Sequence, residues 1–238
     1  MIRAVLFDLD DTLCDAKPAF EAGLRAAFAT IREHHLEFTD ETLRRTWREV
    51  HGPLFADLAD GRLSMAGVRR ERFHRVLSEL GIPNNVFAEE LDLRLGRVQL
   101  DRLVLSEGHE ILEDLRDREL HVGIVTNGAG DAHPDSQRSK ARHLGLLDRV
   151  DSFWVSDEIS HRKPDARAFL PALAAAGCAP SEAIYVGDSP ENDVLGANRA
   201  GMTSVLLWRS ESEPPESEGQ AQPNRVVRSL RAVSDLIG

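Results

Sequence analysis

The sequence predicts an α/β protein whose core is a Rossmann-like parallel sheet, with an all-helical cap domain inserted after the first strand. Two observations lead to this fold class. Short apolar runs alternate with helical patterns along most of the chain, which is typical of the βα units that build parallel sheets. Residues 16–98 interrupt the alternation, because they hold several helical patterns and no clear strand. The 238 residues are enough for a core and a smaller inserted domain.

Short apolar runs mark the predicted strands. Residues 2–8 (IRAVLFD) form the first, and their continuous apolar character indicates a strand buried on both faces. The next four are 121–126 (HVGIVT), 151–155 (DSFWV), 183–188 (AIYVGD) and 203–208 (TSVLLW), and residues 225–238 are expected to hold a short strand and a last helix.

Helical patterns lie between these strands. Ile111, Leu112 and Leu115 recur at helical spacing, and Ser106 is the predicted N-cap of that helix. Further helices are expected at 135–145, 165–176 and 191–200, whereas the acidic and proline-rich stretch 210–224 is expected to be an exposed loop.

Four helical patterns fill the interrupting segment. They cover 18–35, 40–59, 64–81 and 84–98, with a turn at Gly81-Ile82-Pro83. We therefore predict that 16–98 form the cap domain and that 1–15 with 99–238 form the α/β core.

The charge of the chain disfavours one class of partner. The net charge of −11 disfavours nucleic acid as a partner, because phosphate backbones are bound by clustered Lys and Arg. Residues 16–98 hold thirteen basic and thirteen acidic residues, so the excess acid lies in the core. This distribution suits a divalent cation held among carboxylates, or a surface that is acidic for solubility alone.

The remaining composition indicates a protein of the cytoplasm. The two cysteines, Cys14 and Cys178, do not make a disulfide framework. The chain begins with MIRAVLFDLDD, which is no signal peptide, and no apolar run reaches the ~20 residues that span a bilayer. We expect no membrane partner, and the sequence predicts no oligomeric state.

Three predicted strands end in polar residues: Asp8, Thr126 and Asp188. Parallel sheets carry their active sites beyond the carboxyl ends of the strands, so these side chains are expected to converge. Asp10 lies on the same side of an extended segment as Asp8, because side chains alternate. Two such carboxylates repel one another unless a cation or a shared proton intervenes. With a divalent cation present, one carboxylate could attack phosphorus while the other transfers protons.

Three further sites fit a phosphate and a hard cation. Asp188 lies in the segment GDSPEND (187–193), and magnesium prefers oxygen ligands. Asp193 could orient a metal-bound water or simply complement a helix N-terminus. Thr126-Asn127-Gly128 offers a hydroxyl and backbone N–H groups to a phosphate. Lys163 is one of only three lysines, against twenty-six arginines, and could serve as a compact positive charge.

Taken in order, these motifs resemble the haloacid dehalogenase superfamily, in its phosphatase branch with an inserted helical (C1-type) cap. The similarity rests on DLDDTL (8–13), TNG (126–128), KP (163–164) and GDSPEND (187–193), and it covers residues 2 to about 208. The sequence departs at Asp11, where glycine is commonest in the family.

The resemblance implies a Mg²⁺-dependent phosphatase that hydrolyses small phosphorylated metabolites. It implies that Asp8 is the nucleophile, forming an aspartyl-phosphate, and that Asp10 is the general acid and base. Phosphate binding would fall to Thr126, Asn127 and Lys163. The Mg²⁺ ligands would be Asp8, the Asp10 carbonyl and Asp188, with Asp193 in support.

The same family also contains proteins with other activities. Dehalogenases of the family lack the carboxylate that Asp10 provides, and phosphonate hydrolysis needs a cap lysine, whereas this cap has only Lys17. A sugar-phosphate phosphomutase shares every core motif and stays as the alternative. A non-catalytic binding module is disfavoured by the intact motif set. Substrate choice is left open, because four cap arginines, at positions 69, 70, 72 and 75, could contact a distal anion or form a solvated helix face.

Overall fold

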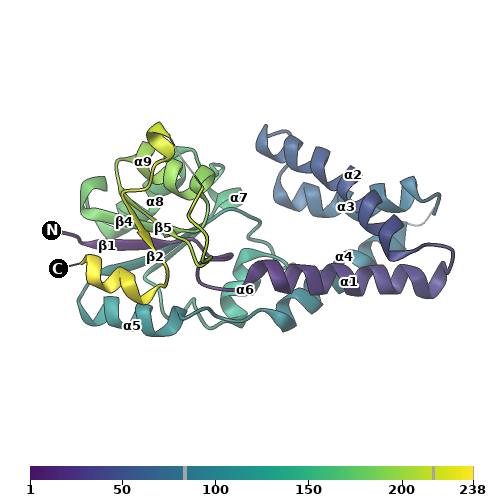
Figure 1. Ribbon diagram of the computed structural model, residues 1–238, viewed down its shortest axis with the longest axis horizontal. Helices are drawn as coiled ribbons and strands as arrows, with labels where there is room; N and C mark the ends of the chain where they lie inside the picture. Colours follow the sequence, from purple (N-terminus) through teal and green to yellow (C-terminus); the bar gives the residue numbers. More distant parts are fainter. Residues whose placement is uncertain (83–84, 216–217, 238) are drawn as a thin grey trace. The chain divides into compact units, whose positions relative to one another are not determined.

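The computed structural model describes residues 1–82, 85–215 and 218–237. Contacts between residues divide the chain into two compact units (Figure 1). We call them the α/β unit (Met1–Ala16, Val104–Asn127 and Ala141–Gly238) and the helical unit (Lys17–Leu103 and Gly128–Lys140).

Six parallel strands form the sheet of the α/β unit, which confirms the predicted fold class. They are β1 (Ala4–Phe7), β2 (His121–Thr126), β3 (Ser152–Val155), β4 (Ala183–Gly187), β5 (Thr203–Leu207) and β6 (Arg225–Val227). Their order is β3-β2-β1-β4-β5-β6. The strand order reverses between β1 and β4, and in open α/β sheets this switch point is where ligands bind.

Helices cover both faces of this sheet (Figure 1). The 3₁₀ turn Ala166–Phe169, α8 (Leu170–Ala176) and α9 (Leu195–Ala200) pack on one face around Phe169 and Tyr185. On the other face lie α5 (Gly108–Asp117) and the C-terminal 3₁₀ segment Arg231–Leu236. Because β1 is covered on both sides, all four of its residues are fully buried. The remaining short elements are α6 (Gln137–His143), α7 (Ser156–Ile159), the 3₁₀ turns Pro180–Glu182 and Gly219–Ala221, and the π-helical turn Pro190–Val194.

The predicted N-cap of α5 is wrong. The cap residue is Glu107, in the left-handed region at φ +57° and without a side-chain capping bond. The hydroxyl of Ser106 donates instead to Asp15, a partner distant in sequence. The Glu107 carboxylate accepts the backbone N–H of Leu230 at 3.0 Å. Tertiary partners therefore displace the local cap that the sequence favours.

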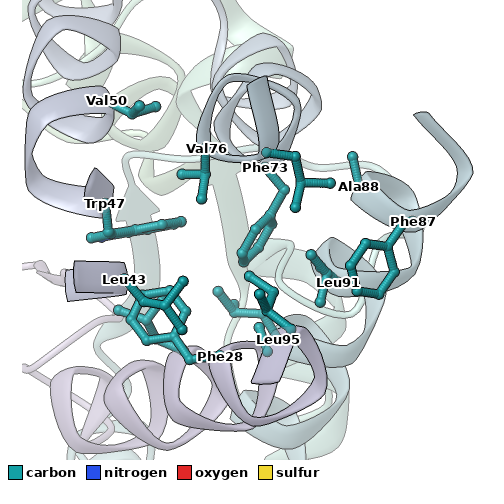
Figure 2. Packing of buried hydrophobic residues seen from close by; sticks show 14 of the residues in the cluster. Phe28, Leu43, Trp47, Val50, Phe73, Val76, Phe87, Ala88, Leu91 and Leu95 are labelled. Carbon is teal, nitrogen blue, oxygen red and sulfur yellow. The ribbon is translucent and has the colours of Figure 1, made fainter. Parts of the chain in front are cut away.

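The helical unit contains the four predicted helices: α1 (Ala16–His34), α2 (Asp40–Ala59), α3 (Met65–Glu79) and α4 (Asn85–Arg102). Figure 2 shows that they enclose their own core, in which Phe28, Trp47, Phe73 and Leu95 pack together. Residues 83 and 84, at the expected turn and start of α4, lie outside the described residues.

The boundaries of the helical unit differ from the expected 16–98. Helix α4 continues to Arg102, and residues Gly128–Lys140 belong to the same unit. Arg72 explains the second difference, since its guanidinium pairs with Asp92 on α4 and lies 3.3 Å from Asp135 in the added segment. Arg72 is 3% exposed and Arg69 is 4% exposed, so a solvated face is the wrong interpretation for both residues.

Two further features concern the whole chain. Cys14 and Cys178 are free cysteines, and Cys14 is buried. Within the described residues, no helix combines the length and the apolar character needed to cross a bilayer.

An aromatic stack on α2 contains a histidine with a shifted pKa. The ring of His51 lies 4.7 Å from that of Trp47 and 4.3 Å from that of Phe55, measured between centroids. Burial lowers the pKa of His51 from 6.5 to about 4, and the positive charge of Arg72 acts in the same direction. The native state therefore holds this imidazole neutral where the unfolded chain would protonate it.

This pKa difference predicts a pH-dependent stability. Below pH 6.5 the unfolded state binds a proton at His51 that the native state does not bind. The contribution of His51 to the free energy of unfolding should therefore be fully present above pH 6.5 and should decline as the pH falls toward 4. Replacing His51→Phe keeps an aromatic ring and removes the titration. We expect the urea unfolding midpoint of the wild type to fall more between about pH 7.5 and about pH 5 than that of the variant. Equal losses in the two proteins would contradict the assignment.

Candidate active site

The central strands bring three predicted site residues to one edge of the sheet. Asp8 follows β1, Thr126 ends β2 and Asp188 follows β4, and these strands are neighbours in the order β2-β1-β4. The backbone N–H of Asp8 continues the ladder by donating to the Val186 carbonyl at 2.9 Å. The convergence inferred from the strand ends therefore has a direct cause in the strand order.

Lys163 reaches the same edge from the loop after α7. Its ammonium group lies 2.7 Å from Asp8 Oδ1 and 2.7 Å from Asp193 Oδ1, and the side chain is 2% exposed. Burial opposes the charged form, but Asp193 and Asp8 outweigh it and raise the pKa of Lys163 above its usual value. One buried cation thus joins the residues after β1 and β4.

The carboxylates outnumber this cation. Burial raises the pKa of Asp8 to about 7, Lys163 opposes this shift, and the charges of Asp193 and Asp188 add to it. Carboxylate oxygens of Asp8, Asp188 and Asp193 lie within 4.8 Å of one another. Oxygen donors of this kind are the ligands that Mg²⁺ prefers, and a divalent cation would relieve the repulsion. The donor set therefore fits a hard divalent cation.

Both carboxylate oxygens of Asp193 have protein partners. Oδ1 accepts from Lys163, and Oδ2 accepts the backbone N–H of Ser189 at 2.9 Å. A Cβ atom on Gly187 would lie 2.3 Å from Asp193 Cγ, so only glycine leaves room for this side chain. These contacts suit the supporting role predicted for Asp193.

Asn127 has a contact that the sequence did not suggest. Its side-chain amide donates to the Lys163 carbonyl at 3.0 Å and accepts the Lys163 backbone N–H at 2.9 Å. This reciprocal pair fastens the lysine loop to the end of β2. Phosphate binding by Asn127 stays a prediction.

Tyr185 is a site residue that the sequence analysis missed. Lys163 donates to its hydroxyl at 2.7 Å, and the hydroxyl donates to the Val125 carbonyl at 2.7 Å. Burial, reinforced by Asp193, raises the pKa of Tyr185 well above 10, so the phenol keeps the proton that it donates. The available signal was that the only tyrosine of the chain lies in an otherwise apolar strand.

The turn after β1 carries Asp10 and explains the departure at Asp11. Asp11 adopts φ +59°, a left-handed conformation that glycine enters freely and that aspartate tolerates better than most residues. The Leu9 carbonyl accepts the N–H groups of Leu13 at 2.9 Å and Cys14 at 3.2 Å, which closes the turn. Aspartate is therefore compatible with the backbone required at this position.

Comparisons with known proteins identify a matching family and several similar proteins. The family described as haloacid dehalogenase-like hydrolase matches residues 2–201. A phosphoserine phosphatase of Thermus thermophilus is 32% identical, with 98% of each chain covered. A ribulose-1,5-bisphosphate 5-phosphatase of Halopiger xanaduensis is 31% identical, with 100% of each covered. The solved structure of a 2-haloacid dehalogenase from Pseudomonas syringae has a TM-score of 0.74 and 26% identity, covering 100% of this chain and 98% of that one.

The buried Tyr185 hydroxyl should stabilise the protein measurably. Tyr185→Phe leaves the Val125 carbonyl without this donor and deprives Lys163 of one acceptor. Such losses typically lower the free energy of unfolding by about 1–3 kcal/mol. Urea denaturation at neutral pH measures the change, and Phe169→Leu, on the same face of the sheet, is a packing control. An unchanged midpoint in Tyr185→Phe would contradict the hydrogen-bond network.

Proposed function

Because this chain belongs to the haloacid dehalogenase-like hydrolases, we propose that it is a magnesium-dependent phosphatase that hydrolyses small phosphate monoesters through Asp8. One observation carries the proposal: the Asp8 carboxylate lies at the strand switch point, 2.7 Å from a buried lysine, with a second carboxylate two residues later. The two phosphatase relatives, at 32% and 31% identity over nearly the whole chain, support this chemistry.

The proposed reaction has two steps. In the first, an Asp8 oxygen attacks phosphorus, the bond to the ester oxygen breaks, and Asp10 protonates the departing alcohol. In the second, Asp10 takes a proton from water, which attacks the aspartyl-phosphate and releases inorganic phosphate with Asp8 restored. Lys163 would offset negative charge on the phosphoryl group, and Thr126 would bind one of its oxygens.

The residues that would hold Mg²⁺ are Asp8 and Asp188 through their carboxylates and Asp10 through its carbonyl. When bound, the cation supplies positive charge that lets a phosphate dianion approach the carboxylates. Asp193 would keep Lys163 in place, since it already accepts a hydrogen bond from that ammonium group at 2.7 Å.

Dehalogenation is the competing reaction, favoured by the 26% identity to a solved 2-haloacid dehalogenase. The two reactions differ in their leaving groups. An alkoxide leaves far more easily when a group such as Asp10 protonates it, whereas a halide leaves as a stable anion. Asp10 therefore favours ester hydrolysis, and we expect no chloride release from 2-chloropropionate. A phosphomutase is the other alternative, and it would transfer phosphate between sugar positions instead of releasing it.

We propose that the helical unit is a cap domain and that it determines which substrate is preferred. Every residue given a chemical role above lies in the α/β unit, so we expect changes in the helical unit to alter which ester is preferred and to spare the reaction itself. The substrate is taken to be a small phosphorylated metabolite, and the different names of the two relatives leave its identity open.

The first functional prediction concerns the metal. Excess EDTA should abolish hydrolysis of an aryl phosphate, and added Mg²⁺ should restore it. Ca²⁺ should restore little activity, because its larger and looser coordination shell places the nucleophile poorly. Mg²⁺ should also raise the thermal unfolding midpoint by relieving carboxylate repulsion, and Asp188→Asn should weaken that rise. Full activity in excess chelator would contradict the proposed dependence on Mg²⁺.

The second functional prediction separates Asp8 from Asp10. Asp8→Asn should show no turnover, because an amide cannot form the aspartyl-phosphate. Asp10→Asn should lose about 10²- to 10⁴-fold, since it lacks the proton-transferring group. With an activated aryl ester the first step needs little acid, so Asp10→Asn should give a burst of phenol and then slow turnover.

Rapid mixing and mass spectrometry measure this behaviour, and Asp11→Asn is the matched control. That variant removes the adjacent carboxylate and should keep most of the activity, because asparagine also tolerates the left-handed backbone. The roles assigned here are wrong if Asp10→Asn turns over at the wild-type rate, or if the phosphoryl label lies outside Asp8.

A further inference from the structure

An arginine that no motif includes binds the turn that carries Asp10. Arg209 Nη1 donates to the Asp11 carbonyl at 2.8 Å, and Nη2 donates to the Thr12 carbonyl at 2.8 Å. Nearly two hundred residues of sequence separate the arginine from the turn. The two bonds therefore tie the segment after β5 directly to the turn after β1.

The chemistry of this contact suits an arginine in particular. The guanidinium group is planar and presents two N–H donors side by side, which match two successive carbonyl groups. Hydrogen bonds from a charged donor are stronger than neutral ones, so this pair holds the turn more firmly than a water contact would. A lysine at this position offers one compact charge and could not fix both carbonyls in the same geometry.

Other contacts hold the backbone that carries Arg209. The N–H of Trp208 donates to the Val227 carbonyl at 2.9 Å, which extends the pairing of β5 with β6. Arg228 donates to the Trp208 carbonyl at 3.3 Å and to the Ser212 carbonyl at 3.0 Å. The arginine thus projects from an anchored segment at the end of β5.

We propose that Arg209 is a positioning residue, which holds the Asp11–Thr12 turn so that the Asp10 carboxylate stays aligned beside Asp8. The inference rests on the proposed function, since it assigns Arg209 an effect on proton transfer by Asp10. Arg209 acts on the reaction through the turn and touches no reacting atom. Small displacements of a proton-transferring group are costly, because the transfer needs hydrogen-bond distance in the transition state.

The kinetic test compares Arg209→Met with Arg118→Met. Arg118 is also an exposed arginine that donates to two backbone carbonyls, those of Ser234 at 3.1 Å and Ile237 at 3.3 Å, but it is the C-cap of α5. We expect Arg209→Met to lower kcat about 10- to 100-fold with little change in KM, while Arg118→Met keeps wild-type kcat. Arg209→Lys should recover part of the loss.

The dependence on the leaving group distinguishes positioning from general destabilisation. In the first step an alkyl phosphate needs acid assistance from Asp10 and an activated aryl phosphate needs little, whereas both need Asp10 in the second step. Arg209→Met should therefore lose more kcat/KM, which reports the first step, on the alkyl ester than on the aryl ester. A variant that is merely unstable would lose the same fraction on both. Equal losses on the two esters, or an equal loss in Arg118→Met, would overturn the proposal.

Hydrogen exchange tests the turn without any substrate. The amides of Leu13 and Cys14, which donate to the Leu9 carbonyl, should exchange faster in Arg209→Met than in the wild type or Arg118→Met. Unchanged exchange would overturn the proposal even if activity fell. If exchange is faster in Arg209→Met but the wild type has no phosphatase activity, Arg209 holds the turn and the phosphatase assignment is wrong. Failure of the Arg209 proposal and failure of the proposed function are therefore distinguishable.

Discussion

The site is organised around the buried ammonium group of Lys163. A lone buried cation would be costly, but this one lies 2.7 Å from carboxylate oxygens of both Asp8 and Asp193. Its position ties together the residues after β1 and β4 and the loop after α7. Removing Lys163 would leave the carboxylates of Asp8 and Asp193 without this cation.

The residues around Lys163 hold its side chain and its loop in this position. Asn127 pairs with the Lys163 backbone, Tyr185 accepts a hydrogen bond from the ammonium group, and Gly187 leaves the space that Asp193 occupies. All three belong to β2 or β4 or lie directly beside them, so the rigid centre of the sheet carries the alignment.

The site residues at the strand ends could be predicted from the sequence. The apolar runs ending at Asp8, Thr126 and Asp188 predicted parallel strands, and parallel strands present their carboxyl ends at one edge. Long-range contacts could not be predicted from the sequence, because they join residues that are distant in the chain. Ser106 donates to Asp15 instead of capping α5, and Arg72 is buried among carboxylates instead of facing solvent. In each case the prediction used the local sequence pattern, whereas the partner of the side chain lies far away in the sequence.

The sequence by itself determined the alternation of strands and helices, the helical insertion and the family motifs, since periodicity and spacing are properties of neighbouring residues. Tertiary structure alone decided which distant groups meet. It placed Tyr185 against Lys163, joined residues 128–140 to the helical unit, and brought Arg209 to the turn beside Asp8. The physical reason is that a hydrogen bond or ion pair acts over a few ångströms in space, and only the folded chain specifies which residues come that close.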